Sequence, residues 1–534
     1  MKLPILLLAL ATGIFARGNC GTAMIQTERP KVQTAAYVSA SKLCDPDLLY
    51  DTVLTRTTAH FAIFYTDSGI HAASAAFIDS LALALEAAYA LHTKTHKTLA
   101  PKGASTTPHY EMEVPSSLYP VEVLDIFHLR NTNSLFGGYC TGCWGGTIAD
   151  QETDEASVII FDNDFKYPAG SEDLKTLETD SGSCNYYEAS AEISNGFYGY
   201  SYAENFGPGV RITAYHELYH AVQFRYHSFD NSNYWFEASA SGQEDIGAPD
   251  VNDYLTFISS FTNMTWTSFA GISNEYSLAA LFLAMYETFG PQFDTKLWEA
   301  FKGSDDLAFE EAFAKVVEEN DLDADSVFQA FAERLFFAGT RSSSRGDIDS
   351  VYTDHELWPN VGVFSEERAL EEKFPYIAYR RTLAYPEVTV PGRVSYLVKN
   401  SGDSVYSKIQ VASEADYRAA YATLESADSV VLVFTRLRET ASSADTSGST
   451  KFYAYPNPWR GTGALCFANI PSGKSVIEIR NRKGNLVHTE RYDSEAHCID
   501  EATLKAKLAP GLYFFRAGRN GKTKKLILIH SSRR

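Results

Sequence analysis

One five-residue pattern constrains this chain more than any other feature: His216-Glu217-Leu218-Tyr219-His220, within the segment RITAYHELYHAVQFRY at residues 211–226. Apolar residues recur along this segment at three- and four-residue steps, which predicts an α-helix. On a helix His216 and His220 project from nearly the same face, one turn apart. Two imidazoles at that spacing can bind one zinc ion, and Glu217 beside them can take a proton from a water on the metal. The alternative is a buried amphipathic helix that carries two histidines by chance.

A catalytic zinc also needs a third protein ligand and one open position. The pattern H-E-x-x-H-x-x-G-x-x-H does not occur, because Gln223 and Tyr226 stand where it requires glycine and histidine. His227 lies two turns beyond His220, and a rigid helix does not readily bring it to the same ion. A polar turn at 228–233 predicts a chain reversal before a second helix, which carries Glu237 followed by the small residues 238–242.

A helix with H-E-x-x-H, a polar turn and an aromatic-Glu-small-residue helix together resemble the gluzincin zinc peptidases. The resemblance implies that Glu237 is the third zinc ligand. It also implies that Glu244, on the same helical face as Glu237, orients a metal-bound histidine by a hydrogen bond to its other ring nitrogen. The chain departs from the family pattern at Ala238, where glycine is usual, and at Tyr234, the aromatic residue three before Glu237. The alternative for Glu237 is an ordinary surface carboxylate.

The N-terminus predicts export. Residues 1–23 begin with Met1-Lys2 and continue in an apolar run at 3–15, which is typical of a secretory signal peptide and too short to span a membrane. No other stretch is apolar enough for a transmembrane segment, so none is expected after the signal is removed. The formal net charge of −21 disfavours nucleic acid and anionic membranes as partners. We therefore expect a secreted or cell-surface protein.

The seven cysteines fit an oxidising compartment. If Cys20 leaves with the signal peptide, an even number remains. Cys140 and Cys143 form a C-x-x-C pair without a thioredoxin-like pattern around it, so a structural bridge is expected there. Cys466 and Cys498 lie in one small C-terminal segment and are expected to pair. The connectivity of the others does not follow from the sequence.

Strands are predicted at 60–66, 110–126 and 157–162, with an amphipathic helix at 72–92. This layout resembles the N-terminal half of a gluzincin-like catalytic domain, in which an edge strand pairs with an extended substrate. Ser157–Asp162 is the candidate for that strand. The segment 167–209, rich in Gly, Ser, Asn and Tyr, predicts surface loops.

The apolar stretch 276–289 predicts a helix that ends at Gly290-Pro291, and the chain continues helical over 309–337. By the same family resemblance, Tyr276 at the start of this helix is a candidate to donate a hydrogen bond to the oxyanion of the reaction. The alternative is a tyrosine that only packs its ring. The predicted metallopeptidase domain covers residues 24–340.

Two further regions are predicted to be rich in β-structure. Residues 342–349 and 439–449 have the composition of linkers, and the domain between them, 350–438, contains strand-like runs at 393–398 and 429–434. The last domain, 450–534, begins with YPNP at 455–458, and continues with a hairpin turn at 483–485, GLY at 511–513 and a final strand at 524–529. These ordered motifs resemble the C-terminal sorting domain of type IX secretion cargo, which implies an export machinery as partner. The alternative is a generic adhesive β-sandwich.

The sequence thus predicts an α+β protein, with a zincin-like catalytic domain followed by β-rich, β-sandwich-like domains. The predicted function is that of a secreted zinc metalloprotease acting on proteins or peptides. Two alternatives remain open: a zinc hydrolase of a non-peptide bond, and a non-catalytic, zinc-stabilised surface or adhesion protein. The candidate catalytic residues are Glu217 and Tyr276. The candidate Zn²⁺ ligands are His216, His220 and Glu237. Glu244 is the candidate residue that orients a metal-bound histidine.

Overall fold

The computed structural model describes most of the chain in two compact units. One unit comprises residues 1–232 and 239–256, and the other comprises 233–238 and 257–534. The boundary predicted between 340 and 350 falls inside the second unit. Helices and sheets occur in both units, which confirms the α+β prediction. The described residues are 44, 49–126, 144–150, 153, 155–167, 173–180, 182–188, 191–192, 202–227, 234–263, 265–269, 272, 275–302, 307–365, 374–385, 392–438, 453–455, 459, 464–468, 476–483, 485–491, 497–517 and 524–528. The predicted signal peptide, the turn at 228–233, Cys140, Cys143 and the predicted linker at 439–449 lie outside them.

Within the described residues, the first unit contains a six-stranded sheet with parallel strands at its centre. β2, β4 and β6 run parallel, while β1 and β5 join antiparallel to β2 and β6. The predicted strands at 60–66 and 157–162 are confirmed, and β4 occupies the second half of the stretch predicted at 110–126. The strands are β1 (Leu54–Thr57), β2 (Phe61–Tyr65), β3 (Lys102–Gly103), β4 (Tyr119–Leu124), β5 (Gly145–Ala149) and β6 (Ala156–Asp162).

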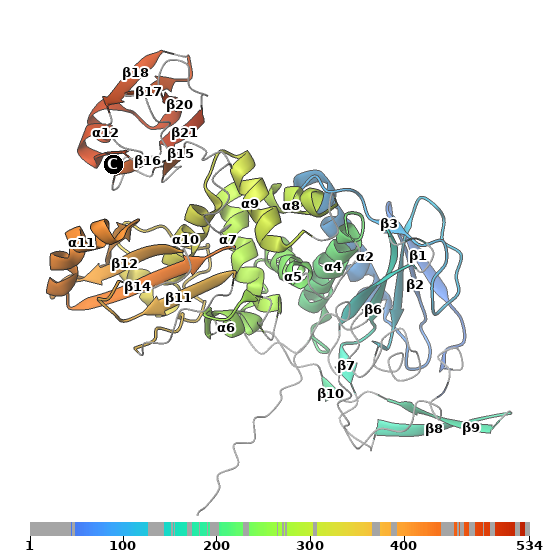
Figure 1. Ribbon diagram of the computed structural model, residues 1–534. Helices are drawn as coiled ribbons and strands as arrows, with labels where there is room; N and C mark the ends of the chain where they lie inside the picture. The colour runs from blue at the N-terminus through green and yellow to red at the C-terminus, as the bar shows by residue number, and fades with distance from the viewer. Residues whose placement is uncertain are drawn as a thin grey trace, which may run out of the picture. The chain divides into compact units, whose positions relative to one another are not determined.

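Two helices, α2 (Ala75–Ala90) and α4 (Phe206–Gln223), share one hydrophobic core with one face of this sheet (Figure 1). All residues of β4 and β6 are buried, as expected for parallel strands that are covered on both faces. The hydroxyl of Ser74 caps α2 by accepting a hydrogen bond from the Phe77 amide. The helix continues as the π-helical turn η3 (Leu91–Thr95).

Within the described part of the chain, the continuous helical segment Ala75–Thr95 is the single helix long and apolar enough to cross a membrane. Its apolar side chains Phe77, Ile78, Leu81 and Leu85 are buried against the sheet and α4. This packing accounts for its composition without a membrane, because a helix inside a protein core meets an equally apolar surrounding.

The prediction of surface loops over 167–209 is wrong in part. This stretch contains an exposed antiparallel hairpin, and α4 begins before it ends. The disulfide Cys44–Cys184 attaches the hairpin to the N-terminal segment, where the Cys44 amide also donates to the Asn185 carbonyl. The loop prediction relied on polar composition, which a two-stranded ribbon exposed on both faces shares. The elements are β7 (Lys166–Tyr167), β8 (Leu174–Thr179), β9 (Gly182–Tyr187) and β10 (Ala191–Glu192).

A helical region follows the H-E-x-x-H helix. The helix predicted at 276–289 begins as a 3₁₀ turn and continues as an α-helix. Gly290 ends it with a φ of +86°, and its N–H donates a hydrogen bond to the Tyr286 carbonyl oxygen. The region predicted to be helical at 309–337 forms two helices. The elements are α5 (Trp235–Gly247), α6 (Leu255–Asn263), η7 (Glu275–Leu278), α7 (Ala279–Phe289), α8 (Phe293–Lys302), α9 (Phe309–Glu319), α10 (Ala324–Leu335) and η8 (Gly339–Ser344).

The β-rich region at 376–436 is a single antiparallel sheet with helices on both faces, not two packed sheets. On one face, the Gln329 amide of α10 donates to the Ser395 hydroxyl. On the other, Leu424 and Tyr417 of α11 pack against alternate residues of the same strands, such as Tyr396. The order is β11-β14-β12-β13. The elements are β11 (Tyr376–Arg380), β12 (Arg393–Lys399), β13 (Ser407–Val411), α11 (Glu414–Ser426) and β14 (Ser429–Arg436).

The predicted linker at 342–349 is packed rather than free. Its Ser344 carbonyl accepts a hydrogen bond from the Tyr406 amide. Immediately after it, Val351, Trp358 and Val361 are buried. A small-polar composition therefore did not mark a domain boundary here.

The C-terminal segment forms two sheets around one core, a β-sandwich. The sheets have the orders β15-β16-β19 and β18-β17-β20-β21, and the core between them includes Trp459, Phe467 and Phe515. The predicted Cys466–Cys498 disulfide is confirmed. The elements are β15 (Tyr453–Tyr455), β16 (Leu465–Ala468), β17 (Val476–Asn481), β18 (Leu486–Arg491), β19 (His497–Ile499), α12 (Glu501–Lys507), β20 (Gly511–Ala517) and β21 (Lys524–Leu528).

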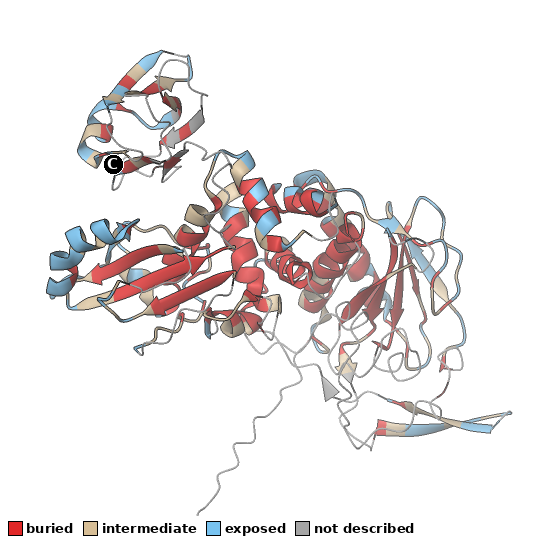
Figure 2. Ribbon diagram, viewed as in Figure 1, coloured by how far each residue is buried: buried red, intermediate tan, exposed pale blue. Residues whose placement is uncertain are grey.

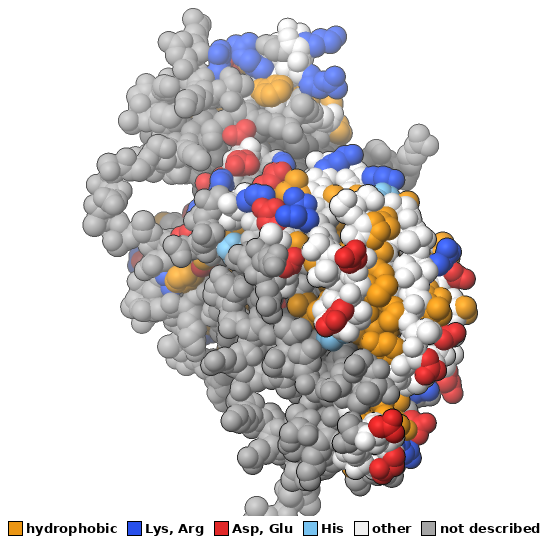
Figure 3. All heavy atoms as spheres, turned by 90° about the vertical axis from the view of Figure 1, so that its right-hand side faces the viewer, with side chains coloured by type: hydrophobic (Ala, Val, Ile, Leu, Met, Phe, Trp, Pro, Cys, Tyr) orange, Lys and Arg blue, Asp and Glu red, His pale blue; other side chains and the backbone are white. Residues whose placement is uncertain are grey.

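Charge is mixed on the surface. On the described part of the face in Figure 3, acidic, basic and apolar side chains are interspersed, and no continuous basic surface is visible there. This distribution accords with the net charge of −21.

Candidate metal centre

Helix α4 holds both histidines inside the core. Its residues from Gly209 to Gln223 are buried apart from Arg211, and Figure 2 shows the helix buried along most of its length. Residues His216 and His220 are 3% and 0% exposed. Their Nε2 atoms are 3.0 Å apart. The helix is therefore not amphipathic in the usual sense, because its polar residues are as buried as its apolar ones.

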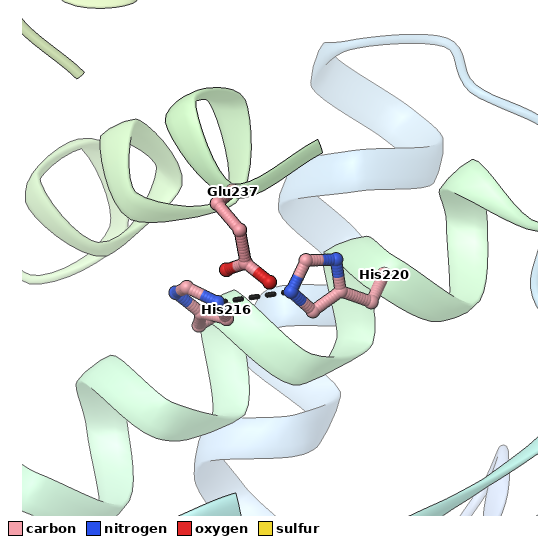
Figure 4. A group of neighbouring side chains, drawn as sticks. All are labelled: His216, His220 and Glu237. Carbon is pink, nitrogen blue, oxygen red and sulfur yellow. Dashed lines mark hydrogen bonds between the residues drawn. The ribbon is translucent and has the colours of Figure 1, made fainter. Parts of the chain in front are cut away.

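Helix α5 supplies the third group from its first turn, where Glu237 lies. The turn is anchored by its aromatic residues: the Trp235 indole donates to the buried Asp294 carboxylate at 2.6 Å, and the Phe236 ring packs on Trp298. The small residues that follow, from Ala238 to Ser241, are fully buried. Figure 4 shows the Glu237 carboxylate pointing toward the two imidazoles. Ligand atoms of His216, His220 and Glu237 all lie within 4.8 Å of one another.

Each histidine has a hydrogen-bond partner on its other ring nitrogen. Glu244 Oε1 lies 2.5 Å from Nδ1 of His216. Gln223 Oε1 lies 2.6 Å from Nδ1 of His220, and the Gln223 amide donates to the Ser239 hydroxyl at 2.9 Å. Because the NH₂ of Gln223 faces Ser239, its oxygen accepts the Nδ1 proton of His220. Both histidines therefore carry their proton on Nδ1 and turn the Nε2 lone pair inward.

This donor set fits a divalent metal ion. Two inward lone pairs and a carboxylate repel one another in a buried site, and a cation among them converts that repulsion into attraction. With bonds of about 2.0–2.1 Å, a separation of 3.0 Å between the nitrogens corresponds to an angle of about 95° at the metal. Two imidazoles and one carboxylate also make up a ligand set that leaves a position open. The group can hold a metal ion, as the sequence predicted.

Glu217 follows His216 in the chain, is buried, and is held by the sheet. Its carboxylate Oε2 and its main-chain carbonyl both lie 2.8 Å from the Thr147 hydroxyl of β5. Gly145 of the same strand leaves the space that the Glu217 side chain fills. A Cβ at Gly145 would lie 2.8 Å from the Cγ of Glu217, closer than carbon atoms approach. Strand β5 thus contacts the Glu217 carboxylate through Thr147 and leaves space for its side chain at Gly145.

The prediction that Ser157–Asp162 is an edge strand is wrong. β6 pairs with β4 and with β5, so it lies inside the sheet. Among the described strands β5 pairs with β6 alone, and it is the edge that touches Glu217. The apolar run SVIIF at 157–161 is typical of a central parallel strand, and this signal favoured an interior position from the outset.

The remaining candidates lie as follows. Tyr276 is the second residue of η7 and half-buried, with its ring centroid 5.2 Å from that of Phe257; its catalytic role stays a prediction. His227 lies beyond the end of α4 and is not one of the three residues of the candidate metal group. Glu244 contacts His216 as described, and its orienting role is likewise a prediction.

Three residues at the site were not singled out from the sequence. Gln223 follows His220 by three residues, a spacing at which helical side chains meet, so its contact with His220 was open to prediction. Thr147 and Glu275 had no such signal, since each is distant in sequence from what it faces. Burial, and after it the negative charge of Glu237, raise the pKa of Glu275 to about 7.

No protein-family model matches this chain, and no curated protein matches it. The candidate metal centre is accordingly interpreted from its own geometry.

Proposed function

We propose that this protein is a secreted zinc-dependent peptidase of the gluzincin type. The observation that supports the proposal best is the buried convergence of His216, His220 and Glu237, with the buried Glu217 next to His216 in the chain. Imidazole nitrogens and a carboxylate oxygen in a four-coordinate arrangement favour zinc over calcium or magnesium, which prefer oxygen ligands alone. A protein or peptide is the proposed substrate.

Zinc held by these three residues would polarise the scissile carbonyl and lower the pKa of the attacking water. Glu217 takes one proton from that water as the water oxygen bonds to the carbonyl carbon. It then delivers the proton to the amine nitrogen as the C–N bond breaks, which returns Glu217 to the carboxylate. Glu244 and Gln223 keep both imidazoles in the required tautomer throughout. Tyr276 is proposed to donate to the carbonyl oxygen as negative charge develops there.

The edge of β5 is the proposed docking site for the substrate backbone. Among the described strands β5 pairs with β6 alone, and an extended peptide that adds to the outer edge of a sheet gains main-chain hydrogen bonds irrespective of its sequence. Gly146 of β5 has no side chain, which allows a second chain to approach closely.

Metal analysis together with a peptide-cleavage assay tests the proposal. We expect one zinc per chain in the purified wild type, and loss of most of that zinc in Glu237→Ala. Glu217→Gln should keep the metal but lower kcat by about 10²- to 10⁴-fold, the usual range for a general base. Glu287→Gln, an exposed change on α7, is the matched control and should behave as wild type. A wild type without zinc, or a Glu217→Gln variant with full turnover, would contradict the proposal.

The C-terminal sandwich is proposed to act as the export signal of a type IX secretion pathway. The Cys44–Cys184 and Cys466–Cys498 disulfides accord with an oxidising destination. In a Gram-negative host with that pathway, the full chain should reach the medium or cell surface. A chain that ends at residue 449 should remain in the periplasm. Equal release of both chains would show that the sandwich is not the signal.

A further inference from the structure

Thr147 of β5 is hydrogen-bonded to Glu217, although it is not one of the three candidate metal ligands. Thr147 is fully buried on β5, and its Oγ1 lies 2.8 Å from two atoms of one residue, the Oε2 and the main-chain oxygen of Glu217. Successive side chains of a strand point to opposite faces of the sheet. Thr147 and Gly145 therefore lie on the face toward α4, whereas Ile148 lies in the hydrophobic core on the other face. A single side chain of the sheet therefore contacts both the carboxylate and the backbone of the proposed general base.

This arrangement fixes the Glu217 side chain. A glutamate has three rotatable bonds, and a general base is effective only if its oxygen lies within hydrogen-bond distance of the reacting proton. The bond to Thr147 restrains Oε2, while the contact of Cγ with Gly145 restrains the middle of the side chain. Under the proposed function, Oε1 is the carboxylate oxygen that takes the proton from water, because Oε2 is held by Thr147.

A hydroxyl suits this task because it donates a hydrogen bond without adding charge. While Glu217 is a carboxylate, the Thr147 hydrogen is donated to Oε2. Once Oε1 has taken the proton from water, Oε2 is the carbonyl oxygen of the carboxylic acid and still accepts from Thr147. The carboxyl group therefore need not move between the two steps.

We propose that Thr147 is a positioning residue for the general base Glu217, and that Gly145 is the glycine this positioning requires. The inference rests on the proposed function, because it assumes that Glu217 is the base. The inference adds that β5 supports turnover by positioning Glu217, and that this contribution is separate from metal binding.

Nearby Thr213 provides a matched comparison. It is also buried, one turn before Glu217 on α4, and its Cγ2 would lie 2.8 Å from a Cβ at Gly145. Its hydroxyl, unlike that of Thr147, has no hydrogen-bond partner within the described residues. Thr147→Val and Thr213→Val therefore make the same chemical change, at two neighbouring buried sites, with and without the contact to Glu217.

The experiment compares zinc content, melting temperature, kcat and KM of the full chain. Thr147→Val should keep its zinc and its KM within about twofold while kcat falls about 10- to 100-fold, the loss expected from misplacing a reacting group. Thr147→Ser should recover kcat to within about threefold, because the hydroxyl is restored. Thr213→Val should match the wild type. Gly145→Ala, which keeps the hydroxyl but displaces Glu217, should lose kcat as Thr147→Val does.

Crystal structures of the wild type and Thr147→Val supply a measure independent of turnover. Glu217 Oε2 should leave its position next to residue 147 in the variant, with both imidazoles unmoved. Equal kcat in Thr147→Val and Thr213→Val, an unmoved Glu217, or no recovery in Thr147→Ser would overturn the inference. If Thr147→Val does not fold, Gly145→Ala and Thr147→Ser decide it. A wild type that lacks zinc and turnover would instead refute the proposed function, and the position of Glu217 in the two structures would still decide the role of Thr147.

Discussion

The two imidazoles of the candidate metal centre are oriented by chemically different residues. His216 faces the carboxylate of Glu244, whereas His220 faces the neutral carboxamide of Gln223, itself held by Ser239. A carboxylate raises the basicity of the ring that it contacts, and a carboxamide fixes the tautomer without adding charge. His216 is therefore expected to be the stronger ligand of the two.

Substitutions of these two partners should weaken metal binding without removing a ligand. We expect Glu244→Gln and Gln223→Leu each to raise the Kd for zinc about 10- to 100-fold, the usual effect of losing such a partner. Competition with a chromophoric chelator measures this change. Glu414→Gln, an exposed change on α11, is the control and should leave the Kd unaltered. A Glu244→Gln variant with the affinity of wild type would show that the contact to His216 does not support the metal.

A buried histidine outside the metal centre should make stability depend on pH. Burial lowers the pKa of His96 to about 4, from 6.5 in an unfolded chain. The unfolded chain therefore binds more protons than the folded chain between these values, so stability is lost as the pH falls from 6.5 to 4. The loss from this residue is about 3 kcal/mol, at 1.36 kcal/mol per pH unit.

Urea unfolding at a series of pH values checks the effect of His96. The wild type should lose stability steadily below pH 6.5, and His96→Gln should be less sensitive over the same range. Identical pH dependence in the two proteins would assign the acid sensitivity to other groups, such as the neighbouring His92, whose pKa burial also lowers.

At the scale of secondary structure, the close approach of α4 and α5 determines the metal centre. The small residues at 238–242 are buried, and side chains of this size let the two helices approach closely. A second point of close contact lies at the end of α5, where a Cβ at Gly247 would lie 2.4 Å from carbons of the Tyr215 ring. Tyr215 precedes His216, so the packing of this ring bears directly on the first ligand.

Gly247→Ala should therefore force the Tyr215 ring aside and destabilise the protein by about 1–3 kcal/mol, as overpacked cores do. Gly207→Ala on α4 is the matched control. Its added Cβ would meet only Asn205 Oδ1, at 3.9 Å, so stability should stay the same or rise by up to about 1 kcal/mol. Urea unfolding of the two variants measures the difference. An equal effect of both substitutions would show that the ring adapts without cost.

At the scale of the whole molecule, the two disulfides found among the described residues close loops of very different length. Cys44 and Cys184 are 140 residues apart, and Cys466 and Cys498 are 32 apart. A crosslink stabilises mainly by restricting the unfolded chain, and the restriction grows with the length of the closed loop.

Replacing Cys44 and Cys184 by serine should thus cost more stability than replacing Cys466 and Cys498. The chain-entropy relation gives upper values of about 5 and about 4 kcal/mol for loops of these lengths. Urea midpoints of the two double variants, beside that of the oxidised wild type, make the comparison. A larger loss from the C-terminal pair would indicate that the hairpin β8–β9 contributes little to the stability of its unit.

Local sequence determined much of this protein by itself. Spacing and turn chemistry within a few residues predict three elements: the helix with His216 and His220, the small-residue helix with Glu237, and the hairpin turn at 483–485. Such short-range patterns depend little on the rest of the fold. The contact of Glu244 with His216 could be predicted for the same reason, because the two helices were expected to pack together.

The tertiary structure alone decided the rest. Whether β5 forms the edge of the sheet depends on which strands pair. The apolar run at 157–161 is typical of an interior strand, but no local feature marked β5 as the edge beside it. The contact of Thr147 with Glu217, the approach of Gly247 to Tyr215 and the packing of residues 342–361 have the same origin. Each joins residues far apart in the chain, and only folding brings them within contact distance.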